Sequence, residues 1–229
     1  MAIFKTKVKR NYSYFNNIFY SYFLKKYREK IFKIFLENIK LKKIYKVIDI
    51  GSTAVDSMSE NYFLHNYPYK KSISCFSNQK LDNLKKKYPF LIIKKGDGRN
   101  TNLPDNYYEI VHSNATIEHV GSFENQIKFV RELYRISKKI IFMQTPNRYF
   151  PIDFHTLLPF LHWLPKKIHR KILDIIGLKF LSKESNLNLL SIKELKEICR
   201  IIKINSYSIK KVKIFGLVSN LILIIRKPN

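Results

Sequence analysis

The sequence predicts an α/β fold in which a mostly parallel sheet is covered by helices on both faces. Two observations support this class: short apolar segments alternate with helical segments along the middle of the chain, and each apolar segment ends in polar or turn-forming residues. A content of 45% hydrophobic and 14% aromatic residues is typical of a folded globule. A chain of 229 residues is expected to form a single domain, assigned to 1–229.

The central part of the chain predicts five strands with helices between them. The strands are expected at 46–50, 72–76, 90–95, 108–114 and 139–145. The helices are expected at 61–70 as far as Pro68, at 79–88 and at 123–136. Strands that alternate with helices imply parallel pairing with right-handed crossovers. Ligands of such sheets bind at the carboxyl ends of the strands, where the strand order reverses.

The two ends of the chain add elements to this centre. Apolar residues at helical spacing predict an amphipathic helix over 16–40, inside an N-terminal extension assigned to 1–43. These residues are Ile18, Tyr22, Leu24, Ile31, Ile34 and Phe35. Ser191 and Glu194 have the spacing of a capping box, which predicts that a helix starts there. The last segment indicates two strands around Gly216, which fits a seven-stranded sheet.

The chain is strongly basic, with 43 Lys and Arg against 17 Asp and Glu and a formal net charge of +26. This charge indicates either an anionic partner, such as nucleic acid or an anionic membrane surface, or a proteome in which lysine is the usual solvated residue. The lysines are spread along the whole chain instead of gathering in one binding tail. We therefore expect peripheral contact with anionic membrane as one option and no specific nucleic-acid partner.

The cysteine content and the absence of long apolar runs predict a cytoplasmic protein. Cys75 and Cys199 lie far apart without the spacing of metal ligands, so neither a disulfide framework nor a metal site is expected. The basic N-terminal segment lacks the apolar core of a signal peptide. No apolar run approaches the roughly 18–20 residues that span a bilayer. Attachment at the inner membrane face remains an option.

The segment "GDGRNTNLPDNYYEIVHSNATIEHV" (96–120) resembles class I S-adenosylmethionine-dependent methyltransferases. Members of this family commonly show a Gly-Asp pair after the third strand, a Leu-Pro turn, and an "SNA" segment followed by Glu-His-Val. "VIDIG", which ends at Gly51, matches the start of the family's first motif, so the resemblance covers about residues 44–147. It implies a Rossmann-like sheet of seven strands and S-adenosylmethionine as the cofactor.

The resemblance also implies which residues contact the cofactor. Asp49 suits the methionine ammonium, and Gly51 lets the backbone approach the cofactor without a β-carbon in the way. Asp97, followed by Gly98, resembles the acceptor for the adenine amino group. Both aspartates have an alternative role as turn-forming residues at the ends of strands. The last two implied contacts, Asn114 and Ala115 at the end of the fourth strand, would flank the methionine moiety.

The sequence departs from the family pattern at two places. Thr53 and Val55 replace the second and third glycines of the usual D-x-G-x-G-x-G loop. The acidic residue that usually binds the ribose hydroxyls at the end of the second strand is also missing. Ser77, with Asn78 and Gln79 behind it, can donate or accept neutral hydrogen bonds there, which are weaker than charge-assisted ones. Glu60 is an alternative ribose contact.

A second stretch, "TPNRYFPIDFHTLLPFLHWLP" (145–165), resembles a subset of these enzymes often encoded with cell-surface polysaccharide or lipid biosynthesis. Asp153 and His155 fall where an acceptor would bind. If the chain there is extended, both side chains point to the same side and face the acceptor. His155 would then act as a general base, with Asp153 or another carboxylate orienting its ring. The alternative is a structural histidine that is hydrogen-bonded in a loop.

The segment that follows, part of an insertion assigned to 148–190, combines aromatic and basic residues. It indicates a mobile lid, an interfacial patch for anionic lipid, or a packed helix. Together these features predict a methyltransferase that acts on a small-molecule, glycan or lipid-linked acceptor. The alternatives are an RNA methyltransferase, favoured only by the charge, and a non-catalytic scaffold that retains the fold.

Overall fold

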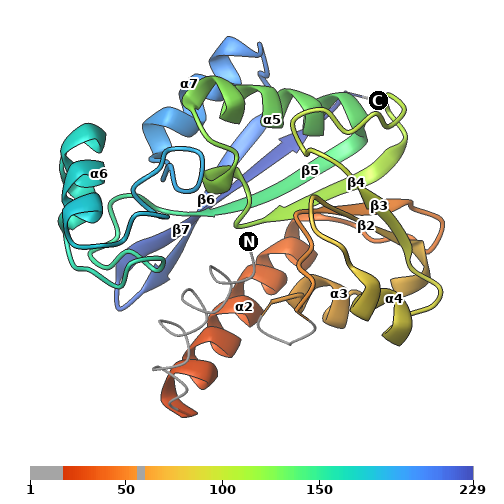
Figure 1. Ribbon diagram of the computed structural model, residues 1–229. Helices are drawn as coiled ribbons and strands as arrows, with labels where there is room; N and C mark the ends of the chain where they lie inside the picture. The colour runs from red at the N-terminus through yellow and green to blue at the C-terminus, as the bar shows by residue number, and fades with distance from the viewer. Residues whose placement is uncertain (1–17, 56–59, 229) are drawn as a thin grey trace.

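A single seven-stranded sheet runs through the molecule, as described for residues 18–55 and 60–228 in a computed structural model (Figure 1). Its strand order is β3-β2-β1-β4-β5-β7-β6, and every neighbouring pair from β3 to β5 is parallel. Only β7 runs antiparallel, to both β5 and β6. The strands are β1 (Val47–Ile50), β2 (Ile73–Ser77), β3 (Ile92–Lys95), β4 (Tyr108–Asn114), β5 (Ser137–Pro146), β6 (Tyr207–Ile214) and β7 (Leu217–Arg226). The prediction of a mostly parallel, seven-stranded α/β fold is confirmed.

Helices cover both faces of this sheet. Figure 1 shows α2, α3 and α4 on one face, α5 and α7 on the other, and α6 away from both groups. The helices are α2 (Ile18–Asn38), α3 (Tyr62–Asn66), α4 (Asp82–Lys87), α5 (Phe123–Ile136), α6 (Lys166–Ile175) and α7 (Ile192–Ile201). Short 3₁₀ turns lie at Lys70–Ser72, Ile117–His119 and Leu161–Trp163. In the described residues no helix is long and apolar enough to cross a membrane.

Two apolar cores follow from the alternation of side chains along the strands. Ile48 and Ile50 pack with Phe129 and Ile198 under α5 and α7. The alternate residue of β1, Val47, packs with aromatic side chains under α2 and α3. Because successive residues point to opposite faces, Asp49 is turned toward the α2 face. This alternation decides where the first predicted cofactor residue lies.

Helix α2 confirms the predicted N-terminal helix. Phe35 is 1% exposed and Ile31 is 8% exposed, whereas Ile34 is only half-buried. The side chains of Ile18, Tyr22 and Leu24 lie outside the described residues. Phe35 forms an edge-to-face contact with Phe142 of β5, with ring centroids 5.2 Å apart. The helix therefore belongs to the core of the described fold.

Several predicted boundaries differ from the observed ones. The helix expected at 61–70 is the short α3, because the chain is extended at Tyr67 before Pro68 and resumes only as a 3₁₀ turn. The helix expected at 79–88 starts at Asp82. The third strand is shorter than expected, and the fifth is longer. The helix expected at 123–136 is α5, with the predicted bounds.

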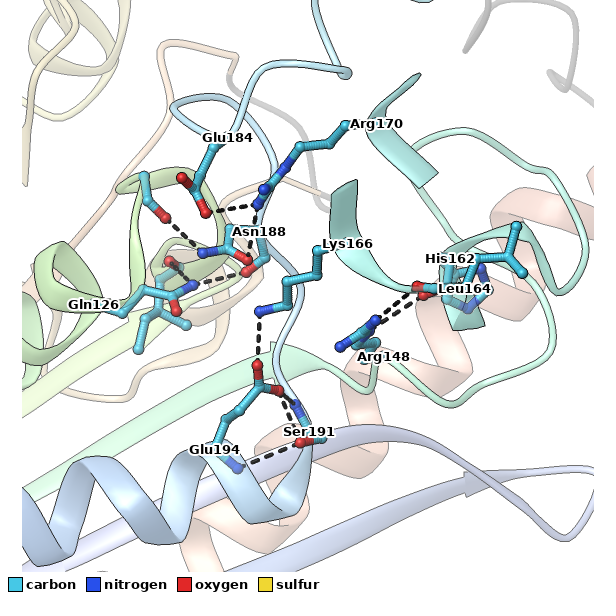
Figure 2. Close-up of polar contacts among 12 residues, drawn as sticks. Gln126, Arg148, His162, Leu164, Lys166, Arg170, Glu184, Asn188, Ser191 and Glu194 are labelled. Carbon is cyan, nitrogen blue, oxygen red and sulfur yellow. Dashed lines mark hydrogen bonds and ion pairs between the residues drawn. The ribbon is translucent and has the colours of Figure 1, made fainter. Parts of the chain in front are cut away.

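The predicted capping box at α7 is confirmed. The Ser191 hydroxyl accepts from the Glu194 backbone N–H at 3.3 Å, and Glu194 Oε2 accepts from the Ser191 N–H at 2.8 Å. The second carboxylate oxygen of Glu194 binds Lys166 Nζ of α6 at 2.6 Å (Figure 2). These bonds hold the pKa of Glu194 below its usual value despite burial, and they tie α6 to α7.

The segment between β5 and α7 is held by bonds within itself and by a bond to α5, which Figure 2 shows. Arg148 donates to the carbonyls of His162 and Leu164 at 3.2 and 2.9 Å. Arg170 of α6 pairs with Glu184 at 2.7 Å. Gln126 of α5 donates to the Asn188 carbonyl at 2.7 Å. These bonds, with the burial of His169 and Leu173 of α6, are those of a packed segment, as in the packed-helix alternative.

Candidate cofactor and acceptor site

A cleft of about 1590 Å³ lies at the carboxyl ends of the central strands. It falls where the strand order reverses between β1 and β4, the place where ligands of open α/β sheets bind. Its wall runs from Ser77 at the end of β2, past Asn114 at the end of β4, to His155 in the segment after β5. The strand ends therefore bring residues from distant parts of the sequence to one elongated site.

Six of the seven predicted cofactor residues line this cleft: Gly51, Ser77, Asp97, Gly98, Asn114 and Ala115. Asp49 does not. It is 6% exposed and lies on the opposite face of β1, beside a smaller cavity of about 120 Å³. This cavity shares Gly51 and Asn114 with the cleft, so Asp49 lies close to the cleft without lining it. The other six residues are placed where a ligand could reach them.

Asp49 is held in a buried pair with His112 of β4. The register of the two parallel strands places them opposite each other, and His112 Nδ1 lies 2.6 Å from Asp49 Oδ1. The hydroxyl of Ser52 donates to Asp49 Oδ2 at 2.9 Å. The His112 ring stacks on Phe63 of α3, with centroids 3.8 Å apart. The sequence analysis missed His112, although its position opposite Asp49 in two predicted neighbouring strands was a usable signal.

Position 51 requires a glycine for a reason other than the expected approach of the cofactor. Its φ is +98°, and a β-carbon there would lie 2.0 Å from the hydroxyl oxygen of Thr116. Thr116 Oγ1 donates to the Ile50 and Asn114 carbonyls at 3.3 and 3.1 Å, so it joins the ends of β1 and β4. The glycine therefore makes room for Thr116, not for the cofactor alone. A large substitution at Gly51 would disturb the fold as well as any ligand.

The adenosine end of the predicted site carries an ion pair. Asp97 accepts from Arg99 Nη2 at 2.5 Å and from Arg99 Nε at 3.0 Å. The hydrogen bonds from Arg99 hold the pKa of Asp97 below its usual value. Ser77 is buried, and its hydroxyl accepts from the Gln79 N–H at 3.2 Å. Glu60 also lines the cleft, so a carboxylate is available near the missing acidic position of β2.

The acceptor end is built around His155. Asp153 is fully buried, and its Oδ1 accepts from both the backbone N–H and Nδ1 of His155 at 3.0 Å. The chain turns here, and the Leu157 N–H donates to the Asp153 carbonyl at 2.7 Å. The chain is therefore not extended here, so the condition under which both side chains would point to the same side is not met. In this arrangement Asp153 is a positioning residue, and only His155 lines the cleft.

The charge of this pair is set by its contacts. Burial opposes ionisation of Asp153, but the hydrogen bonds from His155 and its charge lower the Asp153 pKa to about 2. Burial likewise opposes the charge on His155. The hydrogen bond to Asp153 outweighs this effect of burial, so the His155 pKa is raised. Beside them lie His119, whose ring centroid is 5.0 Å from that of His155, and the fully buried Glu118.

The lining of the cleft suits a ligand with a neutral nucleoside end and a cationic end. Among the described residues, Oε1 of Gln144 and Oδ1 of Asn220 are buried without a hydrogen-bond partner. Both side chains belong to the cleft wall, on β5 and β7. Such acceptor oxygens favour an ammonium or sulfonium group nearby. Arg28 of α2, which the sequence analysis missed, also lines the cleft and suits a carboxylate.

Residues 48–140 match the family model described as "Methyltransferase domain". The middle of the chain is therefore similar to a methyltransferase domain. The predicted fold is confirmed, and the match and the fold support the predicted class I S-adenosylmethionine-dependent family and its cofactor, whereas the subset linked to cell-surface biosynthesis stays a prediction. The matched residues hold β1 from its second residue, β2 to β4, α5 and all seven predicted cofactor residues, but not Asp153 or His155. No curated protein matches the sequence.

Solved structures share this fold at low sequence identity. A SAM-dependent methyltransferase from Methanosarcina mazei is 9% identical, with 84% of this chain and 96% of that chain covered and a TM-score of 0.55. A SAM-dependent methyltransferase from Aquifex aeolicus is 14% identical, with 84% and 88% covered and a TM-score of 0.53. A Haemonchus contortus phosphoethanolamine N-methyltransferase, solved with phosphomonomethylethanolamine and S-adenosylhomocysteine, is 11% identical, with 80% and 39% covered and a TM-score of 0.55. These likenesses establish the fold alone.

The close approach of Gly51 to Thr116 gives a stability prediction. Gly51→Ala should lower the free energy of unfolding by about 2–5 kcal/mol, because backbone strain and a steric clash add. Gly216→Ala is the matched control: its φ is also positive, at +80°, but nothing lies within 4 Å of an added β-carbon. It should cost only about 1–2 kcal/mol. Urea denaturation measures both, and equal losses would show that Thr116 does not restrict position 51.

Proposed function

We propose that this protein transfers a methyl group from S-adenosylmethionine to a hydroxyl of a small-molecule, glycan or lipid-linked acceptor. The observation that carries the proposal is the shared cleft. One end of the cleft is lined by the strand ends of the methyltransferase domain. The other end is lined by His155, which the buried carboxylate of Asp153 holds in place. A donor and an acceptor bound in one cleft can be aligned for transfer.

The chain's own residues suggest how the cofactor would be held. Ser77 and Glu60 would take the ribose hydroxyls, and the backbone around Gly98 would border the adenine. Asn114, Ala115 and the Gln144 amide oxygen would border the methionine end, and Arg28 lies in the same cleft wall. This is an expectation from position in the cleft. It assigns no direct contact to Asp49.

S-adenosylmethionine supplies an activated methyl group on a sulfonium, which becomes a neutral thioether when the carbon–sulfur bond breaks. The protein must bring the acceptor oxygen in line with that bond and exclude water. A hydroxyl must also lose its proton as the new carbon–oxygen bond forms. His155 lies in the cleft wall with Nδ1 engaged by Asp153, which leaves Nε2 for the acceptor. Asp153 would fix the ring orientation.

A second feature favours an acceptor that is presented at an anionic membrane. Ile168, Lys171 and Ile175 are spaced along one side of α6 and are exposed, whereas His169 and Leu173 on the other side are buried. The neighbouring turn adds exposed Phe160, Trp163 and Leu164. Apolar side chains interspersed with lysine are typical of helices that lie in a membrane interface.

His155→Ala should lower methyl transfer to a hydroxyl acceptor by about 10²–10⁴-fold, the usual contribution of general acid–base catalysis. Binding of S-adenosylhomocysteine should change little, because its expected contacts lie at the other end of the cleft. The measurement is transfer of labelled methyl from S-adenosylmethionine to a panel of glycans and lipid-linked glycans. His65→Ala, on α3 outside the cleft, is the control. If folded His155→Ala keeps full turnover, or only amines are methylated, the hydroxyl assignment is wrong.

The double variant Ile168→Ser/Ile175→Ser should bind anionic liposomes at least about tenfold more weakly than the wild type. Each isoleucine that enters the interface contributes up to about 1.5–3 kcal/mol, and 1.4 kcal/mol is tenfold. Ile44→Ser, at a still more exposed isoleucine in the loop before β1, should bind like the wild type. Co-sedimentation with phosphatidylserine vesicles measures this. Equal liposome binding by the wild type, the double variant and Ile44→Ser would exclude α6 as the membrane contact. Firmer binding to RNA than to liposomes at physiological salt would favour the RNA alternative instead.

A further inference from the structure

Glu118, His119 and His155 form a cluster at the acceptor end of the cleft. One potential ligand atom from each residue lies within 4.8 Å of the others. The three come from two segments: the turn after β4 carries Glu118 and His119, and the segment after β5 carries His155. The sequence analysis predicted no metal site, because it considered only cysteine spacing and these residues are distant in the chain.

Both histidines are held through the same ring nitrogen, Nδ1. His119 Nδ1 lies 2.7 Å from the Asn186 carbonyl, which can only accept, so this nitrogen carries the hydrogen. His155 Nδ1 is held in the same way by the Asp153 carboxylate at 3.0 Å. In the neutral rings Nε2 therefore carries the lone pair. Imidazole ligands of metal ions typically donate their other N–H to a carbonyl or carboxylate in this manner.

Glu118 supplies an independent observation. Its side chain is fully buried, and Oε2 accepts from the Thr145 hydroxyl at 3.0 Å. Oε1 is buried without a hydrogen-bond partner among the described residues. Leaving a carboxylate oxygen buried and unpaired is costly, and such oxygens are usually paired or bound to a metal. The second buried carboxylate of this region, Asp153, adds another negative charge close by.

We propose that Glu118, His119 and His155 bind one divalent transition-metal ion, with Zn²⁺ the first choice. Two imidazoles and one carboxylate with a further position open are a common ligand set of catalytic zinc. Ligand bonds of about 2.0–2.2 Å require the three atoms to approach to about 3.4 Å, a side-chain adjustment of the order of 1 Å. His119 and His155 line the cleft, so the open position faces it.

This inference deepens the proposed function, and the role of the metal ion in the reaction rests on that function. A hydroxyl acceptor would occupy the open position, and the ion would lower the hydroxyl pKa as zinc does for water. The hydroxyl proton would then pass to solvent, the oxygen would bond to the methyl carbon, and the carbon–sulfur electron pair would stay on sulfur. In the metal-loaded protein the ion replaces His155 Nε2 as the group that prepares the acceptor. Asp153 keeps its positioning role.

The test is metal binding to the full chain, without a polyhistidine tag and with prior removal of metal by chelator. Zn²⁺ affinity is measured by competition with a chromophoric chelator, and Co²⁺ is used for its absorption spectrum. The wild type should bind one ion per chain. Glu118→Gln and His119→Ala should each weaken binding by more than about 100-fold, and Asp153→Asn by about 10–100-fold. His65→Ala should bind like the wild type.

The outcomes are separable. Glu118→Gln keeps the shape of the side chain and the bond from Thr145, and unfolding curves without metal show whether a variant is folded. If folded Glu118→Gln and His119→Ala bind Zn²⁺ as tightly as the wild type, or the wild type binds more weakly than about 10 μM, the site is wrong. S-adenosylhomocysteine binding in the absence of Zn²⁺ tests the proposed function separately. If the protein binds S-adenosylhomocysteine but not Zn²⁺, only the metal site is overturned.

Discussion

The parallel pairing of β1 with β4 is the constraint on which the site depends. It joins the two halves of the sheet at the place where strand order reverses, and its register sets Asp49 opposite His112 and Ile50 opposite Ser113. Thr116 then bonds across the ends of both strands, and Gly51 leaves it room to do so. A shift of one residue in this register would move Asp49 to the cleft face and Ile50 out of its core.

The first motif, which differs from the family pattern, is held by side-chain contacts. Its aspartate is bound by His112 and Ser52 on the α2 face, inside a group of aromatic rings. The turn after Gly51 is stabilised by side chains, since Asn61 receives the Thr53 N–H at 3.2 Å and donates to the Val55 carbonyl at 2.8 Å. Side-chain bonds of this kind can fix a loop where glycines are absent.

Features with a strong local cause could be predicted from the sequence. Helix α5 follows from apolar spacing, and α7 follows from the capping-box spacing of Ser191 and Glu194. The chain around Tyr67 could not be predicted as well, because a short helix depends on tertiary packing more than on its own residues. The position of Asp153 relative to His155 depends on a turn that no residue pattern indicated. The gathering of Glu118 with His155 depends on long-range folding, and no local signal indicates it.

The central claim is that the cleft at the β1–β4 junction binds the cofactor of the methyltransferase domain. Isothermal titration calorimetry of S-adenosylhomocysteine into the metal-free wild-type protein tests it most directly. The account predicts one binding site per chain with a dissociation constant in the micromolar range, which corresponds to a binding free energy of about −8 kcal/mol. It also predicts that Asn114→Leu, which changes the cleft wall at the end of β4, weakens this binding. Absence of heat up to millimolar ligand in a folded wild-type sample would contradict the account and favour a scaffold that keeps only the fold.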